Sequence, residues 1–137
     1  MQQGYKIVGK IDIQIEIVPV PFEKISDQQP AEPSNMVRER VIQAREIQSK
    51  RFASDKNIYC NAQMNSRQLN KYAVPDEAGL KILKEAMQRL NLSARAYDRI
   101  LKVSRTIADL DNSDAIESRH LAEAINYRNL DRESWGL

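Results

Sequence analysis

Residues 91–111, NLSARAYDRILKVSRTIADLD, decide the fold class of this chain. Apolar or small side chains recur there at a helical period, and neither proline nor glycine interrupts them. The stripe consists of Tyr97, Ile100, Leu101, Ser104, Ile107 and Ala108. Ser93 precedes the stripe and is a favoured N-cap, because its hydroxyl can accept a hydrogen bond from an N–H group of the first turn. The stretch predicts a long helix with one face for a core.

A second stripe on the same predicted helix is basic, with Arg95, Arg99 and Lys102 spaced i, i+4 and i+7. Arg95 falls in the first turn, where the helix dipole favours anions rather than cations. A guanidinium group there is understandable if a phosphate binds beside it. The simpler interpretation is a solvated surface arginine. Arg95 is therefore the candidate phosphate-binding residue, and Arg99 and Lys102 are candidate phosphate or DNA contacts.

The sequence on either side predicts more helices around this one. They are expected over 34–52, 66–72, 76–90 and 118–128, each with apolar residues at helical spacing. Three of these helices are expected to begin at a serine N-cap, namely Ser34, Ser66 and Ser118. Asn91 is expected to end the third helix in the left-handed conformation that asparagine tolerates. The predicted fold is an all-α bundle of about five helices, two of them short.

Residues 11–18 do not follow a helical period. Isoleucine alternates there with polar residues in the period-two pattern of a β-strand. No second strand of that quality follows, so we expect this orphan strand to be poorly ordered or paired non-natively. Residues 19–33 hold four of the five prolines and are expected to be an extended linker. The predicted units are a strand remnant over 1–18, the Pro-rich linker over 19–33, the helical domain over 34–130 and a flexible tail over 131–137.

Composition narrows the classes of function. A chain of 137 residues fits one domain, and its net charge of +2 gives no bulk attraction for a polyanion. We recognise no apolar leader and no membrane span, so we expect a cytoplasmic protein that does not contact a membrane. The sequence has no GxxxxGK[ST] loop for phosphates. Cys60 and His120 each lack a second ligand nearby, so we assign no metal and no catalytic residue, and we expect His120 at the surface.

Four segments carry a resemblance: RVIQAREIQSKRF, NAQMNSRQL, LSARAYDRILKVSRTIADL and HLAEAINYRNLDR. They resemble the C-terminal part of the magnesium-chelatase-like AAA+ ATPases of the ComM/YifB type, and the resemblance covers residues 11–132. It implies that the chain is the helical lid of such an ATPase, without the P-loop core, and that residues 11–18 are the last core strand. Arg95 in Ser93-Ala94-Arg95 matches the family's sensor-2 arginine, which reaches the γ-phosphate. The arginine-finger role is not carried over, because Lys10 stands at the matching position and lacks a bidentate fork.

The resemblance also implies cofactors and partners. ATP and Mg²⁺ would bind to the full-length parent and not to this fragment, which is not expected to be an enzyme by itself. The implied partners are the upstream P-loop core, neighbouring subunits of a ring-shaped homo-oligomer (expected to be a hexamer), and DNA that the ATPase remodels in recombination or natural transformation. Two alternatives stay open. One is a DNA-binding module that uses the basic stripe, although Asp98, Asp109 and Asp111 flank it. The other is a protein-interaction bundle that uses the helix of residues 38–51.

Overall fold

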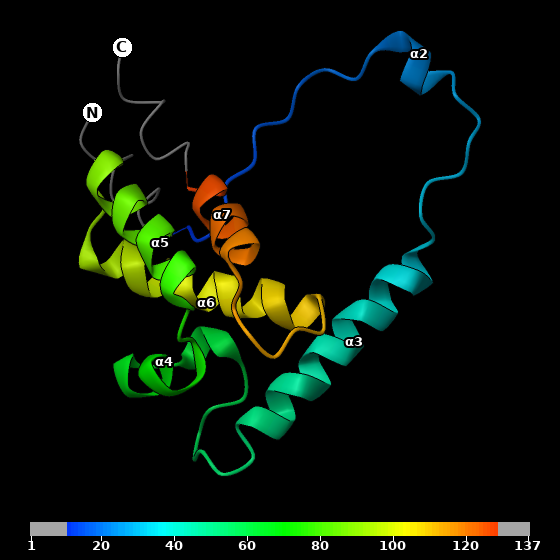
Figure 1. The fold of residues 1–137 in the computed structure, drawn as a ribbon. Coiled ribbons are helices and arrows are strands. Elements are labelled where there is room, and N and C mark those ends of the chain that lie inside the picture. Colours follow the sequence, from blue (N-terminus) through cyan, green and yellow to red (C-terminus); the bar gives the residue numbers. More distant parts are fainter. Residues whose placement is uncertain (1–10, 129–137) are drawn as a thin grey trace, which may run out of the picture.

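The computed structural model describes residues 11–128, most of which are helical (Figure 1). In chain order the elements are α2 (Phe22–Ile25), α3 (Ser34–Arg51), the 3-10 helix η1 (Asn61–Gln63), α4 (Ser66–Tyr72), α5 (Glu77–Arg89), α6 (Ala94–Leu110) and α7 (Ser118–Asn126). The described residues form no β-strand, and one isolated parallel bridge joins Pro75 to Ile116. The all-α prediction is confirmed. The predicted tail over 131–137 lies outside the described residues.

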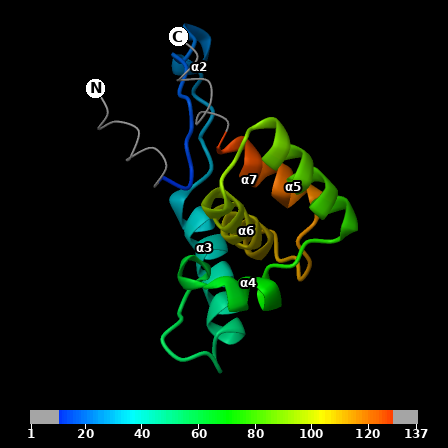
Figure 2. The same cartoon turned by 90° about the vertical axis from the view of Figure 1, so that its left-hand side faces the viewer.

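The central element of the bundle is α6, the helix that the opening stretch predicts. Figure 2 shows α5 and α7 on one side of it, and α3 and α4 on the other. Ile100, Leu101 and Ala108 of the predicted stripe are buried, whereas Tyr97 and Ile107 are half-buried. The core also contains Phe52, Met64, Leu69, Ala73, Leu83, Ile116, Leu121, Ala124 and Ile125. Complete burial of an isoleucine or leucine side chain stabilises the folded state by about 1.5–3 kcal/mol. The other helices therefore gain stability by packing against this stripe.

The beginning of α6 follows the prediction in detail. Ser93 Oγ accepts a hydrogen bond from the N–H of Ala96 at 3.2 Å, as an N-cap does. Asn91, directly after α5, has a φ of 47°, the left-handed conformation expected for it. The turn that brings the chain from α5 into α6 is therefore encoded locally.

The other three predicted N-caps are wrong by one residue. The N-caps are Pro33, Asn65 and Glu117, and the serine that follows each of them is the first helical residue. Before α4, Asn65 Oδ1 accepts hydrogen bonds from the N–H groups of Arg67 and Gln68. Asparagine competes with serine on equal terms for such a position, so the local pattern alone did not distinguish them.

A close helix contact joins α5 to α7. A Cβ atom added at Gly79 would lie 2.6 Å from Cδ1 of Leu121 and 3.0 Å from Cβ of Pro75. Gly79 therefore allows α5 to approach the buried side chain of Leu121 more closely than any other residue would.

The predicted strand over 11–18 is absent from the structure. One backbone hydrogen bond, from the N–H of Gln14 to the carbonyl of Tyr127 at 3.0 Å, joins this segment to the bundle. No neighbouring strand among residues 11–128 offers a ladder, so the alternating isoleucines remain exposed. The expectation that these residues are poorly ordered stays a prediction.

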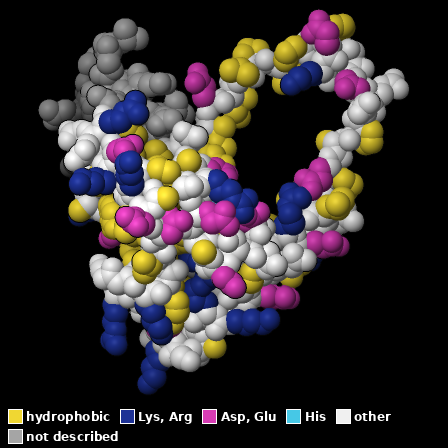
Figure 3. Space-filling view, in the orientation of Figure 1, with side chains coloured by type: hydrophobic (Ala, Val, Ile, Leu, Met, Phe, Trp, Pro, Cys, Tyr) yellow, Lys and Arg dark blue, Asp and Glu magenta, His cyan; other side chains and the backbone are white. Residues whose placement is uncertain are grey.

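Residues 15–33, which we call the arm, leave the bundle in a wide arc and return at the start of α3 (Figures 1 and 3). Every arm residue is exposed. The linker is not extended throughout as predicted, because the short α2 forms in it, between Pro21 and Ser26. An exposed ion pair between Glu32 and Arg40 joins the end of the arm to α3. Of α3 itself, only Ala44 and Gln48 are buried.

Candidate functional site

Arg95 is placed in the first turn of α6, as the sequence predicts, and its side chain is exposed. No hydrogen bond or ion pair joins it to another residue within 11–128. Ser93 accepts from the N–H groups of Ala96 and Tyr97, through its hydroxyl and its carbonyl. The earlier N–H groups of the helix, those of Ala94 and Arg95, have no acceptor among the described residues. A guanidinium group and two backbone donors are thus available at one helix end.

The other two residues of the basic stripe have intramolecular partners. Arg99 Nε lies 3.4 Å from Oδ1 of Asp12, in the segment that passes beside α6. Lys102 Nζ donates a hydrogen bond to the carbonyl oxygen of Ala62 in η1 at 3.0 Å. The structure therefore separates the predicted stripe into one cation without a described partner, Arg95, and two cations that hold neighbouring segments in place.

A buried ionic network surrounds Asp109 and was not predicted from the sequence. This residue was expected to flank the basic stripe, but its side chain is fully buried. Its carboxylate accepts hydrogen bonds from Arg51 Nη1 at 2.7 Å, from Arg105 Nε at 3.1 Å and from Asn61 Nδ2 at 2.8 Å. A second bond from Arg51 makes that pair bidentate.

This network connects four parts of the bundle. Arg51 belongs to the last turn of α3, Asn61 to η1, and Arg105 and Asp109 to α6. Arg105 also donates to the carbonyl oxygens of Ser113 and Asp114, which hold the loop before α7. Burial lowers the pKa of Arg105, because it disfavours the charged guanidinium, while Asp109 acts in the opposite direction. The i, i+4 pair of opposite charges beside the apolar stripe was the signal available in the sequence.

His120 is a second correction, since it is 2% exposed rather than at the surface. Its Nδ1 accepts a hydrogen bond from the N–H of Glu117 at 3.0 Å. The ring proton must therefore be on Nε2, which lies 3.1 Å from Oδ2 of Asp111 and donates to it. This hydrogen bond, together with Arg119, lowers the pKa of the Asp111 carboxyl. The imidazole closes the first turn of α7 and ties it to the end of α6.

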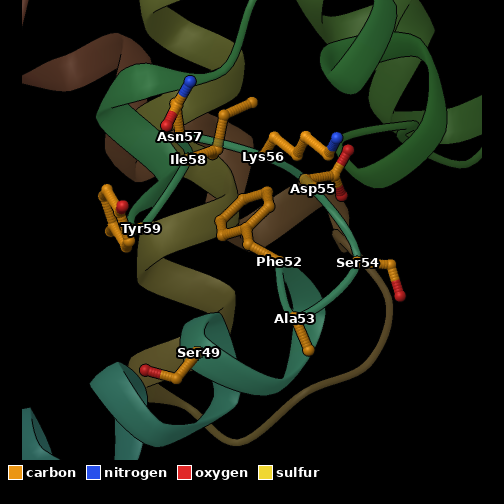
Figure 4. A pocket seen from close by; sticks show the side chains of 9 residues that line it. All are labelled: Ser49, Phe52, Ala53, Ser54, Asp55, Lys56, Asn57, Ile58 and Tyr59. Atoms are coloured by element: carbon orange, nitrogen blue, oxygen red, sulfur yellow. The ribbon is translucent and has the colours of Figure 1, made fainter.

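The loop after α3 encloses an open hollow of about 640 Å³. Figure 4 shows Phe52 at its centre, with Tyr59 at one edge and Lys56 at the other. Cys60 follows this loop as a free, half-buried thiol. Among residues 11–128 no three His, Cys, Asp or Glu side chains gather to hold a metal ion. No helix in that range is long and apolar enough to cross a bilayer.

Comparison with known proteins places this geometry in a family. Residues 31–128 match the family described as the C-terminal domain of magnesium chelatase subunit ChlI. Competence protein ComM of Haemophilus influenzae is 39% identical over 124 residues, which are 88% of this chain and 23% of that protein. The uncharacterized protein YifB of Salmonella typhimurium is 39% identical over 127 residues, 91% of this chain and 24% of that protein.

The uncharacterized protein YifB of Escherichia coli is also 39% identical, over 126 residues. The chain spans about a quarter of the length of these curated relatives (23–24%). The matched range begins just before α3 and contains α3 to α7, with the Asp109 network and Arg95 inside it. This chain belongs to the magnesium chelatase ChlI C-terminal family and is a C-terminal domain of the ComM/YifB type.

Proposed function

We propose that this chain is the lid of a magnesium-chelatase-like AAA+ ATPase, and that Arg95 contacts the γ-phosphate of ATP bound to a P-loop core outside the chain. The state of Arg95 is the observation that carries the proposal. It is exposed at the beginning of the central helix and has no partner among the described residues, whereas Arg99 and Arg105 of the same helix are engaged.

Physical chemistry supports a phosphate as the ligand. A cation at a helix N-terminus costs about 0.3–1 kcal/mol, because it opposes the helix dipole. A phosphate placed there would interact favourably with the dipole and with the guanidinium fork, which matches phosphate oxygens bidentately. The Ser93 cap and the buried Ile100 hold the first turns of α6 in one position. The backbone that carries Arg95 is therefore already in place, and only its side chain would have to be ordered on phosphate binding.

Nucleotide-dependent motion would pass through the same helix. Because α6 contacts α3, α4 and α7, a shift of its N-terminus on phosphate binding would move the bundle as a unit. In the parent protein, ATP and Mg²⁺ would bind at the core, and the subunits would form a ring-shaped homo-oligomer. The relative from Haemophilus influenzae is named a competence protein, and for that reason we take DNA as the proposed substrate of remodelling.

The test is an ATPase assay on the chain joined to the upstream P-loop core. We expect Arg95→Ala to lower kcat by about tenfold or more, because it removes a donor that would stabilise charge on the transferring phosphoryl group. Arg95→Lys keeps the charge but not the bidentate fork, so its kcat should lie between those of the wild type and Arg95→Ala. Arg45→Ala removes an exposed arginine from α3 and serves as the matched control. Equal rates for Arg95→Ala and Arg45→Ala, with both proteins folded by circular dichroism, would refute the proposal.

A second candidate function, protein interaction through α3, is favoured by its exposed apolar residues. Met36, Val37, Val41 and Ile42 are 41–51% exposed on the half of α3 that leaves the bundle. In a ring of subunits this half-helix would contact a neighbouring subunit. Sedimentation of the isolated chain tests whether the interface is sufficient by itself, and a monomer at high concentration would show that it is not.

A further inference from the structure

The end of the molecule opposite the arm has an uneven charge. Residues 47–75 contain five basic residues and a single acidic one, although the whole chain is nearly balanced at 21 basic and 19 acidic residues. The five are Lys50, Arg51, Lys56, Arg67 and Lys71, and the acidic residue is Asp55. Arg51 is neutralised internally by Asp109, and the other four cations are exposed. The single carboxylate, half-buried, accepts a hydrogen bond from the hydroxyl of Tyr72 at 2.7 Å.

The exposed cations are concentrated on α4 and on the loop before it. Figure 3 shows Lys and Arg side chains gathered at the lower left of the molecule, with no Asp or Glu side chain among them. Arg67 and Lys71 are one turn apart on α4, so their like charges repel. Lys71 Nζ lies 4.6 Å from the centre of the Tyr72 ring. Such a cluster creates a positive potential that attracts a polyanion.

The neighbouring hollow adds an aromatic component. Tyr59 stands at its edge, is 73% exposed, and its hydroxyl has no hydrogen-bond partner among the described residues. Phe52 lies at the centre of the hollow and Lys56 at the opposite edge (Figure 4). An exposed aromatic ring beside a hollow and a group of cations is the combination that accommodates a stacked base and its phosphates.

We propose that Lys56, Tyr59, Arg67 and Lys71 form a binding surface for single-stranded nucleic acid. The three cations would contact phosphates, and Tyr59 would stack on an unpaired base. In a duplex the bases are already stacked on each other and do not reach Tyr59, whereas an acidic polypeptide offers charges but no flat ring. The inference rests on the part of the proposed function in which DNA is the remodelled substrate. Its test is separate, because the surface does not include Arg95 and needs no ATP.

The experiment measures fluorescence anisotropy of a labelled oligothymidylate titrated with this chain. Binding through three to four phosphates should weaken by about 20- to 50-fold between about 50 and 200 mM salt. The triple variant Lys56→Ala/Arg67→Ala/Lys71→Ala should weaken binding by about tenfold or more. The matched control Arg45→Ala/Lys81→Ala/Lys84→Ala removes the same charges from exposed positions on α3 and α5 and should change binding by less than about twofold.

Single-residue variants and other ligands complete the test. Tyr59→Ala should weaken binding, whereas Tyr59→Phe, which keeps the ring, should retain it. Arg95→Ala should leave binding unchanged, which separates this surface from the proposed nucleotide contact. The inference is overturned if the wild-type chain fails to bind at low salt, or if the two triple variants lose affinity equally. Equal affinity for duplex DNA or for poly-glutamate would also overturn it.

Discussion

Residues 11–43 and residues 44–128 both contain regularly spaced apolar side chains, yet only the second region buries them. Ile100 in α6 is 0% exposed, whereas Ile17 in the arm is 88% exposed. The two isoleucines belong to equally regular patterns, one helical and one alternating. Burial therefore requires a facing surface as well as a pattern, and only the bundle supplies one for its own helices.

Helix α3 crosses from one region into the other. Its first half has exposed apolar residues, and its second half is held to the bundle largely by polar contacts. Gln48 Oε1 accepts a hydrogen bond from the N–H of Asn61 at 2.9 Å, and Arg51 binds Asp109. A long helix can thus be half free and half fixed: its buried residues begin at Ala44, and the ionic network holds its last turn.

The largest difference between the two regions should come from removing a carboxylate. Asp109→Ala leaves the buried guanidinium group of Arg105 and the partly buried one of Arg51 without their counter-ion, so we expect the free energy of unfolding to fall by about 3–5 kcal/mol. Asp27→Ala in the exposed arm should have no measurable effect. Urea unfolding followed by circular dichroism measures both. A small loss for Asp109→Ala would mean that the network contributes little to the attachment of α3.

The same substitution, isoleucine to alanine, should have different effects in the bundle and in the arm. Ile100→Ala should lower the free energy of unfolding by about 3 kcal/mol, because it removes buried methylene groups and leaves a cavity. Ile17→Ala should change it by less than about 0.5 kcal/mol. The same urea experiment applies. A comparable loss at Ile17 would show that the arm packs against the bundle in solution.

The close contact of α5 with α7 gives a smaller effect. Gly79→Ala gains about 1 kcal/mol of helix propensity but overpacks Leu121 at a cost of about 1–3 kcal/mol. Because Leu121 is fully buried and cannot move freely, we expect a net loss of about 1 kcal/mol. The double variant with Leu121→Ala should lose less than the sum of the single variants. Strict additivity of the two changes would argue against a clash.

The smallest predicted effect depends on pH. The folded pKa of Asp111 lies below its ordinary value of 3.8, so its pairing stabilises the bundle above about pH 4 and is lost as the pH falls through the folded pKa. Asp111→Asn should therefore flatten the dependence of unfolding free energy on pH in that acidic range. The pKa of Glu32 in the arm is also lowered, by its hydrogen bond to Arg40, but both side chains are exposed. Glu32→Gln should give a smaller change, which salt abolishes.

Local sequence was sufficient for the features that depend on one helix at a time. The course of α6, its Ser93 cap, its apolar stripe and the left-handed Asn91 were all predicted, because period and capping act over a few residues. The position of Arg95 in the first turn follows from the same pattern. Its role at a phosphate stays a prediction.

The burial of charged and polar side chains, and the partners of the basic stripe, could not be predicted from the local pattern. Asp109 and His120 each meet a partner from outside their own helix, Arg51 of α3 for the first and Asp111 at the end of α6 for the second. Arg99 and Lys102 looked equivalent to Arg95, but Asp12 and Ala62 come to lie beside them. In each case the partner is brought in by the fold, and charge spacing along one helix does not reveal it.

The sequence by itself determined an all-α bundle around α6, and its motifs carried the family resemblance. Tertiary structure alone decided which charges are internal, how far α3 is attached, and that residues 11–18 form no strand. The physical reason is the range of the interactions. Helix propensity and capping are satisfied within a turn, whereas ion-pair burial and strand pairing need a second surface that the chain must supply from elsewhere.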